Sequence, residues 1–304
     1  MTAATLLRGF RMRVADIRGL RTRYWVGGEG APLVLVHGLG GAAVNFTHLA
    51  PLLARERRVL VPDLPGHGGT ASLPDVESLT DLAEHVRAVA AHEGMLPAAA
   101  VGYSMGGVVA LRLAVARPEA VAALALVAPA GIVSATRRSA TALGVSSVLR
   151  PARAAALLRG AIARRPNLRI PVFGFWGADD PRGLPPEAVL GFLQAQLEHT
   201  DVRGASRALV RDDPRPDLHR VGCPTVVVWG ARDRLVPLDD GFEYARRLRC
   251  PVRVVPAAGH LLVGEEPEAC AALLEGFLDR VGEVDEVGGE VEAAGELVGE
   301  GAHP

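Results

Sequence analysis

The sequence contains no lysine, because all 33 of its basic residues are arginine. It also has only three cysteines, at positions 223, 250 and 270. Their odd number and their spacing fit neither a disulfide framework nor a zinc motif, so we expect reduced, buried thiols. No run approaches the length of a membrane span, and the N-terminal residues lack a secretory pattern. We therefore expect a cytoplasmic location without a membrane span, and the abundance of Ala, Gly and Arg favours a GC-rich bacterial origin.

The net charge of -1 gives no reason to expect nucleic-acid binding. Charge is nevertheless uneven along the chain. Residues 131–222 hold 14 arginines against 8 acids, whereas residues 283–304 hold seven acids and no arginine. The middle of the chain is basic and its end is acidic.

Apolar runs of strand length alternate with helical patterns. The runs lie at 33–36, 58–61, 98–102, 122–127, 225–229 and 252–255. They are nearly continuous rather than alternating, which is typical of parallel strands covered on both faces. Residues 10–26 read instead as an antiparallel hairpin at a sheet edge. This order predicts an α/β fold with a doubly wound, mostly parallel sheet.

The rhythm divides the chain into three parts. Residues 1–130 and 223–282 form the predicted core, whose closing helix begins at Pro267 and runs to Val281. Residues 131–222 are too long for an ordinary crossover and predict an inserted helical cap. Residues 283–304 have no core-forming pattern and predict a disordered acidic tail.

Gly102-Tyr103-Ser104-Met105-Gly106 follows a predicted strand and opens a predicted helix. A Gly-x-Ser-x-Gly motif in this setting places a serine on a sharp turn, with small residues that let strand and helix pass closely. A chance match is the alternative in a sequence with 35 glycines, but the strand and helix disfavour it. We therefore expect Ser104 to be a nucleophile.

A serine nucleophile needs a base and an acid that orients the base. His260 follows the last predicted strand and Asp233 follows the preceding one, so both lie at the edge where α/β sheets gather catalytic groups. Their order along the chain, Ser, Asp, His, fits this type of hydrolase. Asp179 or Asp180 is the alternative acid, but both fall in the cap.

The developing oxyanion needs main-chain donors. We expect these from the N–H of Met105, beside the nucleophile, and from Leu39 in the loop His37-Gly38-Leu39-Gly40-Gly41. His37 is interpreted as a residue that holds this loop. Phe173, Phe175, Trp176 and Phe192 could line a substrate pocket under the cap, although packing within the cap explains them equally well.

Taken together, four motifs resemble those of the α/β-hydrolase superfamily over residues 10–282. They are His-Gly-Leu-Gly, Asp63-Leu-Pro-Gly-His-Gly, Gly-Tyr-Ser-Met-Gly-Gly, and Gly-Ala-Arg-Asp with the later Gly-His. In their overall pattern, these motifs are similar to those of the esterase, enol-lactonase, haloperoxidase-like and C–C hydrolase branches. Ser104 departs from epoxide hydrolases and haloalkane dehalogenases, for which the resemblance would require aspartate there.

The leading hypothesis is therefore a serine carboxylesterase that acts on a small ester-like molecule without cofactor or metal. A C–C bond hydrolase or enol-lactonase acting on a carboxylate-bearing substrate is the first alternative, since the cap is basic. A non-catalytic ligand-binding protein is the second, and the complete triad disfavours it. Neither the physiological substrate nor the oligomeric state can be read from the sequence.

Overall fold

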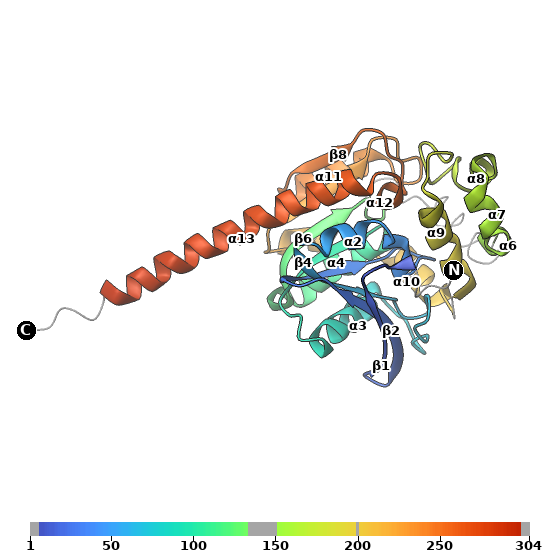
Figure 1. Cartoon of the computed structure of the whole chain (residues 1–304). Coiled ribbons are helices and arrows are strands. Elements are labelled where there is room, and N and C mark those ends of the chain that lie inside the picture. Colours follow the sequence, from blue (N-terminus) through green and yellow to red (C-terminus); the bar gives the residue numbers. More distant parts are fainter. Residues whose placement is uncertain (1–5, 133–150, 199–200, 299–304) are drawn as a thin grey trace, which may run out of the picture.

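One eight-stranded sheet forms the centre of the described part of the protein (Figure 1). The computed structural model describes residues 6–132, 151–198 and 201–298, with the backbone alone for 151–152 and 284–298. The strands follow the order β1-β2-β4-β3-β5-β6-β7-β8 across the sheet. Their bounds are β1 (Arg11–Ile17), β2 (Leu20–Gly27), β3 (Ala31–Val36), β4 (Arg57–Pro62), β5 (Ala98–Tyr103), β6 (Val121–Val127), β7 (Thr225–Gly230) and β8 (Val252–Val255).

Strands β3 to β8 pair in parallel, whereas β1 and β2 form an antiparallel hairpin that joins the sheet through β4. Every residue of β5 and β7 is buried, as expected for continuous apolar strands covered on both faces. The predicted α/β class with a mostly parallel, doubly wound sheet is therefore confirmed.

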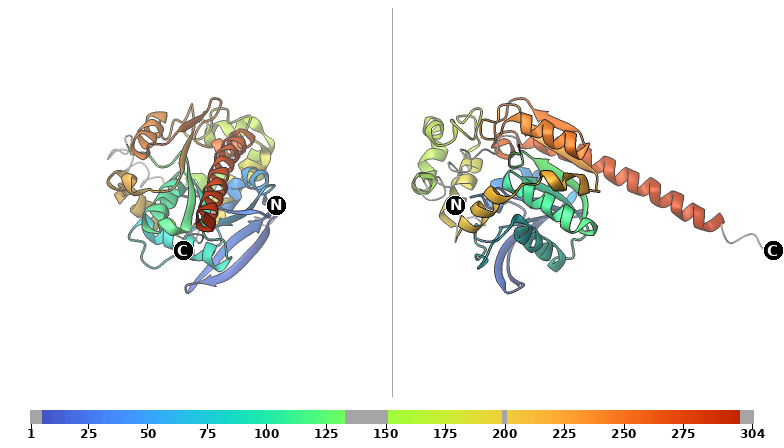
Figure 2. Two further views of the ribbon diagram at one scale, coloured as in Figure 1. Left: turned by 90° about the vertical axis from the view of Figure 1, so that its left-hand side faces the viewer. Right: turned by 180° about the vertical axis from the view of Figure 1, so that it is seen from behind.

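Helices cover both faces of the sheet (Figure 2). Helix α4 (Met105–Ala116) packs on β3, β5 and β6 beside α3 (Leu79–His92), and α11 (Leu238–Leu248) packs on β7. Helices α2 (Leu49–Leu53) and α13 (Pro267–Val298) contact each other, and α13 also lies on β6, β7 and β8. These layers enclose an apolar core between helices and sheet.

The strand register brings the predicted site loops to one edge. Val36 pairs with Gly102, and Tyr103 pairs with Val127, so the ends of β3, β5 and β6 are level. Gly230 pairs with Val255 at the ends of β7 and β8. The strand order reverses beside β3, which makes this edge the topological switch point where α/β proteins place their sites.

The long insertion between β6 and β7 is helical in its described part. Its helices are α6 (Pro151–Leu157), α7 (Arg159–Arg164), α8 (Pro166–Phe173), α9 (Pro186–Glu198), α10 (Arg203–Arg211) and the 3-10 helix η3 (Arg215–Arg220). Helices α6 to α9 gather at one end of the molecule, whereas α10 returns to pack on α3. Residues 133–150 and 199–200 of the predicted cap lie outside the described residues.

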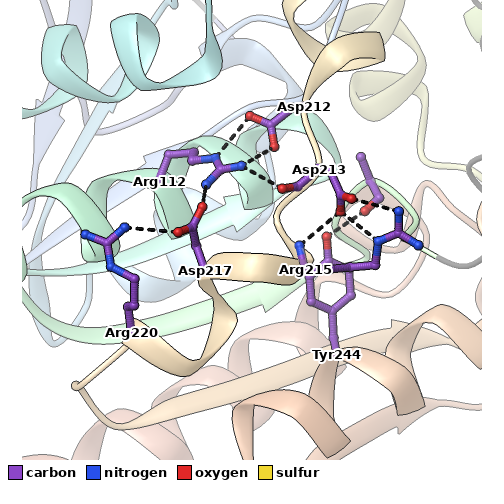
Figure 3. Close-up of polar contacts among 8 residues, drawn as sticks. Arg112, Asp212, Asp213, Arg215, Asp217, Arg220 and Tyr244 are labelled. Atoms are coloured by element: carbon purple, nitrogen blue, oxygen red, sulfur yellow. Dashed lines mark hydrogen bonds and ion pairs between the residues drawn. The ribbon is translucent and has the colours of Figure 1, made fainter.

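Hydrogen bonds fix both ends of this insertion to the core. At its start, Ala130 donates its N–H to the carbonyl of Ser104 at 3.1 Å and accepts the Tyr244 hydroxyl at 2.8 Å. At its end, the Arg112 guanidinium of α4 donates to Asp212 and Asp217, with its shortest contact to Asp217 at 2.6 Å (Figure 3). Arg112 is largely buried, so this ion pair ties the returning chain to the helix that follows Ser104.

The closing helix differs from its prediction. Helix α13 extends past its predicted end at Val281 to Val298 and projects away from the domain. The segment has no proline to end a helix whose first half packs on the sheet. The disorder expected for residues 283–304 stays a prediction. Residues 299–304 of the predicted tail lie outside the described residues.

Candidate active site

Ser104 occupies the turn between β5 and α4 in a strained backbone conformation. Its φ of 56° and ψ of -123° lie outside the regions that a residue with a side chain ordinarily adopts. Two glycines make the turn possible, since a Cβ on Gly102 would lie 2.2 Å from the carbonyl oxygen of Gly106. A Cβ on Gly106 would lie 2.1 Å from that of Val36. The local sequence therefore forces close passage of strand and helix, as the Gly-x-Ser-x-Gly motif predicts.

The structure brings the predicted base and acid to this serine. His260 Nε2 lies 3.1 Å from the Ser104 hydroxyl, and His260 Nδ1 lies 2.7 Å from Asp233 Oδ2. Both His260 and Asp233 are buried. Donation from Nδ1–H to the carboxylate leaves Nε2 as the acceptor that faces the serine hydroxyl, which is the arrangement a general base requires.

Main-chain groups hold the acid in place. Asp233 Oδ1 accepts the N–H groups of Leu235 and Val236, each at 2.8 Å. The loop itself is fixed by Trp229, whose indole N–H donates to the carbonyl of Val236 at 3.0 Å. Asp179, the alternative acid, pairs instead with Arg232 at 2.9 Å. The carboxylate that is hydrogen-bonded to His260 is therefore that of Asp233, in the loop after β7.

Tyr103 packs beside the histidine. The two rings lie 5.4 Å apart between centroids, and the tyrosine is buried. Burial, followed by the negative charge of Asp233, raises the pKa of the Tyr103 phenol well above its ordinary value. Tyr103 therefore supports the imidazole as a neutral ring.

The loop after β3 lies against the nucleophile. A Cβ on Gly38 would stand 2.9 Å from the Cβ of Ser104, so only glycine permits this approach. His37 holds the loop, because its Nδ1 donates to the carbonyl of Gly38 at 2.9 Å and its Nε2 accepts the N–H of Leu64 at 3.0 Å. Burial lowers the pKa of His37 to about 4, so it stays neutral.

The two predicted oxyanion donors belong to these same segments. Met105 is the first residue of α4 and is fully buried, and Leu39 follows Gly38. The N-terminus of α4 adds its partial positive charge beside Ser104. The arrangement can therefore present main-chain donors next to a serine hydroxyl that is hydrogen-bonded to a buried imidazole.

Sequence reasoning missed a buried ion pair between Asp63 and Arg23, which lies next to the segment that follows the β3 loop. Asp63 accepts the N–H of Ala43 at 2.8 Å and that of Gly69 at 2.9 Å, and it pairs with Arg23 Nε at 2.6 Å. Arg23 also pairs with Glu198 at the end of α9. Asp63 stood in a quoted motif, but nothing in the sequence pointed to Arg23 on β2 as its partner.

The aromatic residues predicted to line a pocket fall into two groups. The rings of Phe173, Trp176 and Phe192 cluster, with Phe173 at 6.4 Å from each of the other two. Phe173 and Phe192 are buried, and the Trp176 indole donates to the carbonyl of Val172. Phe175 is 76% exposed and stands apart from this cluster. Packing within the cap accounts for the three clustered rings, and their role as a pocket stays a prediction.

The insertion contacts both halves of the candidate site. From α9, Gln196 donates to the carbonyl of Gly40 at 2.6 Å, in the predicted oxyanion loop. On the other side, Leu261, next to the histidine, donates its N–H to the carbonyl of Gly177 at 3.0 Å. The segment that the sequence predicted as a cap therefore contacts the loops on both sides of Ser104.

Other kinds of site find no support in the part of the chain that the structure describes. No cluster of three or more His, Cys, Asp or Glu side chains is arranged there to hold a metal ion. Over the same residues, no helix combines the length and apolar composition needed to cross a bilayer.

Comparison with known proteins agrees with this geometry. Residues 33–273 match the model of the alpha/beta hydrolase family, and the chain belongs to that family. It is similar to a dihydrolipoyllysine-residue acetyltransferase component of the acetoin cleaving system from Pseudomonas putida, with 33% identity over 87% of this chain and 68% of the relative.

Two further relatives are named for hydrolytic reactions. A pimeloyl-(acyl-carrier protein) methyl ester esterase from Chromobacterium violaceum is 32% identical over 82% of this chain and 94% of its own length. A 2-hydroxy-6-oxo-6-(2'-aminophenyl)hexa-2,4-dienoic acid hydrolase from Metapseudomonas resinovorans is 27% identical over 88% of this chain and 91% of its own. The family and these relatives support a hydrolase.

Proposed function

We propose that this protein is a serine hydrolase that cleaves carboxylic esters through an acyl-enzyme. The observation that carries the proposal is the hydrogen-bonded chain from Ser104 through His260 to Asp233. Ser104, His260 and Asp233 act as nucleophile, general base and orienting acid. A predominantly buried imidazole between a serine hydroxyl and a fixed carboxylate has no evident structural purpose, whereas acyl transfer needs each of these groups.

The reaction runs in two halves. Ser104 Oγ attacks the ester carbonyl while His260 Nε2 takes its proton, and Asp233 stabilises the resulting imidazolium. The N–H groups of Leu39 and Met105 hold the oxyanion, a contribution typically worth about 3 kcal/mol per donor. His260 then protonates the departing alkoxide, and a water molecule activated by the same imidazole releases the acid and restores Ser104.

The ester assignment draws further support from the relative named as a methyl ester esterase, which this chain matches over nearly the whole of that protein. The substrate is a small ester-like molecule, and none of the steps above uses a cofactor. The cytoplasmic location expected from the sequence stays a prediction.

A C–C bond hydrolase or enol-lactonase is the second candidate, and the relative named for a dienoic acid hydrolase favours it. Recognition of a substrate carboxylate by the cap would need an available arginine. Arg169 is the buried arginine of the described insertion, but it donates to the carbonyls of Ile162, Ala163, Arg182 and Leu184. That guanidinium is engaged by four backbone carbonyls, so Arg169 itself does not offer this recognition.

Labelling with a fluorophosphonate and turnover of short p-nitrophenyl esters test the proposal. We expect wild type to react in both assays, Ser104→Ala to react in neither, and His260→Ala to be strongly impaired. Ser78→Ala, far from the site in the sequence, is the matched control. Absence of both labelling and ester turnover in folded wild type would contradict the proposal.

The second candidate is separated by comparing neutral esters with anionic dienoic or enol-lactone substrates as salt is raised. An esterase is expected to prefer neutral esters with little salt dependence. A preference for anionic substrates that weakens with salt would favour the second candidate instead.

A further inference from the structure

Glu265, at the end of the short helix α12 (Leu262–Glu265), joins the insertion to the loop of the histidine. Its Oε2 accepts the N–H of Asp179 at 2.7 Å, and its carboxylate accepts the N–H of Gly259 at 3.1 Å and 3.2 Å from the two oxygens. One side chain thus accepts main-chain N–H groups from the cap and from the residue that precedes His260. These contacts form a joint between the cap and the loop of His260.

The surroundings leave little freedom in this joint. A Cβ on Gly259 would lie 2.6 Å from the carbonyl oxygen of Gly177 and 2.9 Å from the nitrogen of Asp179. On the other side of the histidine, Leu261 donates to the same Gly177 carbonyl. His260 is therefore held between two contacts with the cap, and the carboxylate of Glu265 makes one of them.

The charges around Glu265 come from four segments. Asp179 and Asp233 are the acids that bear on it from the cap and from the loop after β7, and Arg232 and Arg234 pair with Asp179. His260 pairs with Asp233. The remaining titratable neighbours are Tyr103 at the end of β5, Glu266 between α12 and α13, and Cys270 in the first turn of α13.

We propose that Glu265 is a positioning residue of the active site, whose carboxylate fixes the loop of His260 against the cap by accepting the N–H groups of Gly259 and Asp179. This inference rests on the function proposed above. Glu265 touches neither substrate nor the reacting atoms and acts through the placement of the imidazole. Charged acceptors form stronger hydrogen bonds than neutral ones, so the ionised carboxylate holds the joint better than its protonated form.

The environment of this carboxylate favours its protonated form. Burial, with the charges of Asp179 and Asp233, raises the pKa of Glu265 to about 7 against the opposing effect of its two main-chain donors. Acidification replaces this charged acceptor by a neutral one, which forms weaker hydrogen bonds to the N–H groups of Gly259 and Asp179. Full activity should therefore require an ionised Glu265 in addition to the neutral imidazole that general-base catalysis needs.

Glu265→Gln and Glu265→Ala test the proposal, with Glu266→Gln as a control that removes a neighbouring charge of similar burial. The rate of fluorophosphonate labelling of Ser104 and kcat/KM for a p-nitrophenyl ester are measured from about pH 5 to about pH 9. For wild type, the acid limb of the logarithmic profile should be steeper than a single protonation allows. Glu265→Gln should show a single-proton limb and a roughly tenfold lower plateau.

Glu265→Ala should lose more activity than Glu265→Gln, because the amide still offers an acceptor and alanine does not. Glu266→Gln should retain the wild-type profile. If Glu265→Gln is labelled at the wild-type rate with the wild-type limb, this proposal fails while the serine-hydrolase function stands. If folded wild type is itself unreactive, the proposed function fails and the role of Glu265 falls with it.

Discussion

The loop after β4 and the loop after β7 each hold a buried aspartate, and they compensate its charge in different ways. Asp63 and Asp233 each accept two main-chain N–H groups. Asp63 also has a permanent cation, Arg23, at 2.6 Å, whereas Asp233 has only the imidazole of His260 at 2.7 Å. Asp63 therefore has a charged partner at all times, although it shares this partner with Glu198, and Asp233 has one only when the histidine is protonated.

This difference gives the two aspartates different expected roles, one in anchoring a loop and the other in stabilising an imidazolium. A carboxylate with a fixed cation anchors its loop and has no reason to favour an imidazolium. A buried carboxylate whose partner is a titratable ring stabilises the charged intermediate more than the resting state, which is what catalysis requires. Glu265 is a third case, because its carboxylate accepts hydrogen bonds from the main-chain N–H groups of Gly259 and Asp179 and not from an arginine or a histidine.

The largest effect is expected from removing the catalytic charge. Asp233→Asn should lower kcat by about 10³–10⁴-fold, because the amide no longer stabilises the imidazolium or fixes the tautomer. Stability should change much less, since the amide oxygen can still accept N–H groups. Steady-state kinetics and chemical denaturation measure the two, with the exposed Asp239→Asn as control. A loss of stability without a loss of kcat in Asp233→Asn would contradict the different roles assigned to the two aspartates.

Removing the charge of Asp63 should have the opposite pattern, with a large loss of stability and a small loss of kcat. Asp63→Asn leaves Arg23 in a buried site, and breaking such a pair typically costs about 3–5 kcal/mol of unfolding free energy. We expect the lower end, because Glu198 still pairs with the guanidinium. Urea denaturation gives the value, the exposed Asp75→Asn is the control, and kcat per folded molecule should fall far less than in Asp233→Asn.

A double variant sharpens this result. Arg23→Met combined with Asp63→Asn should lose less stability than the sum of the two single changes, because the guanidinium and its buried partner are removed together and only Glu198 loses its cation. Strict additivity would mean that the two residues stabilise the loop independently.

Glu265 gives a smaller effect that depends on pH. Its pKa in the folded protein is raised from 4.5 to about 7, so the folded state binds this proton more tightly than the unfolded chain. Its contribution to stability is complete below about pH 4.5 and is lost as pH rises through about 7, a difference of up to about 3 kcal/mol. Thermal unfolding of Glu265→Gln should show a weaker decline over that range than wild type.

The activity and the stability of Glu265→Gln should therefore move in opposite directions above neutral pH. The variant should be less active than wild type but no less stable. A residue that only supported the fold would lower both, and parallel losses would contradict the positioning role.

The smallest effect is expected at the surface. Arg215 pairs with Asp213 near the end of the insertion, but both side chains are about half exposed (Figure 3). Exposed pairs contribute little because water and salt screen them. Arg215→Gln should match wild type in denaturation midpoint and in kcat/KM, and a measurable loss would show that burial does not decide these contributions.

The proximity of the three proposed catalytic residues was predictable because each lies next to a strand end, and parallel strands bring their ends to one edge. Ser104, Asp233 and His260 meet in the structure for that reason. The partners of the site were not predictable in the same way. Arg23 lies on the strand next to the sheet edge, and Glu265 lies just before the first turn of α13, so both read as ordinary surface charges until the fold buries most of each side chain.

The cap was the least predictable part. Its helices were expected, but the placement of their side chains depends on packing that no local pattern specifies. Phe175 is solvent-exposed although its neighbours Phe173 and Trp176 are packed together. The closing helix runs past its predicted end at Val281 to Val298, and the disorder expected for residues 283–304 stays a prediction.

The two fixed ends of the insertion bear on how this protein can change. Ala130 is bonded to Ser104 and Tyr244, and Asp212 is bonded to Arg112, so the core meets the insertion at the same points whatever lies between them. For a loop whose ends are held, doubling its length adds only about 0.6 kcal/mol of closure entropy. Segments of other lengths can therefore be exchanged between these anchors at small thermodynamic cost, while Ser104, Asp233 and His260 keep their places in the core.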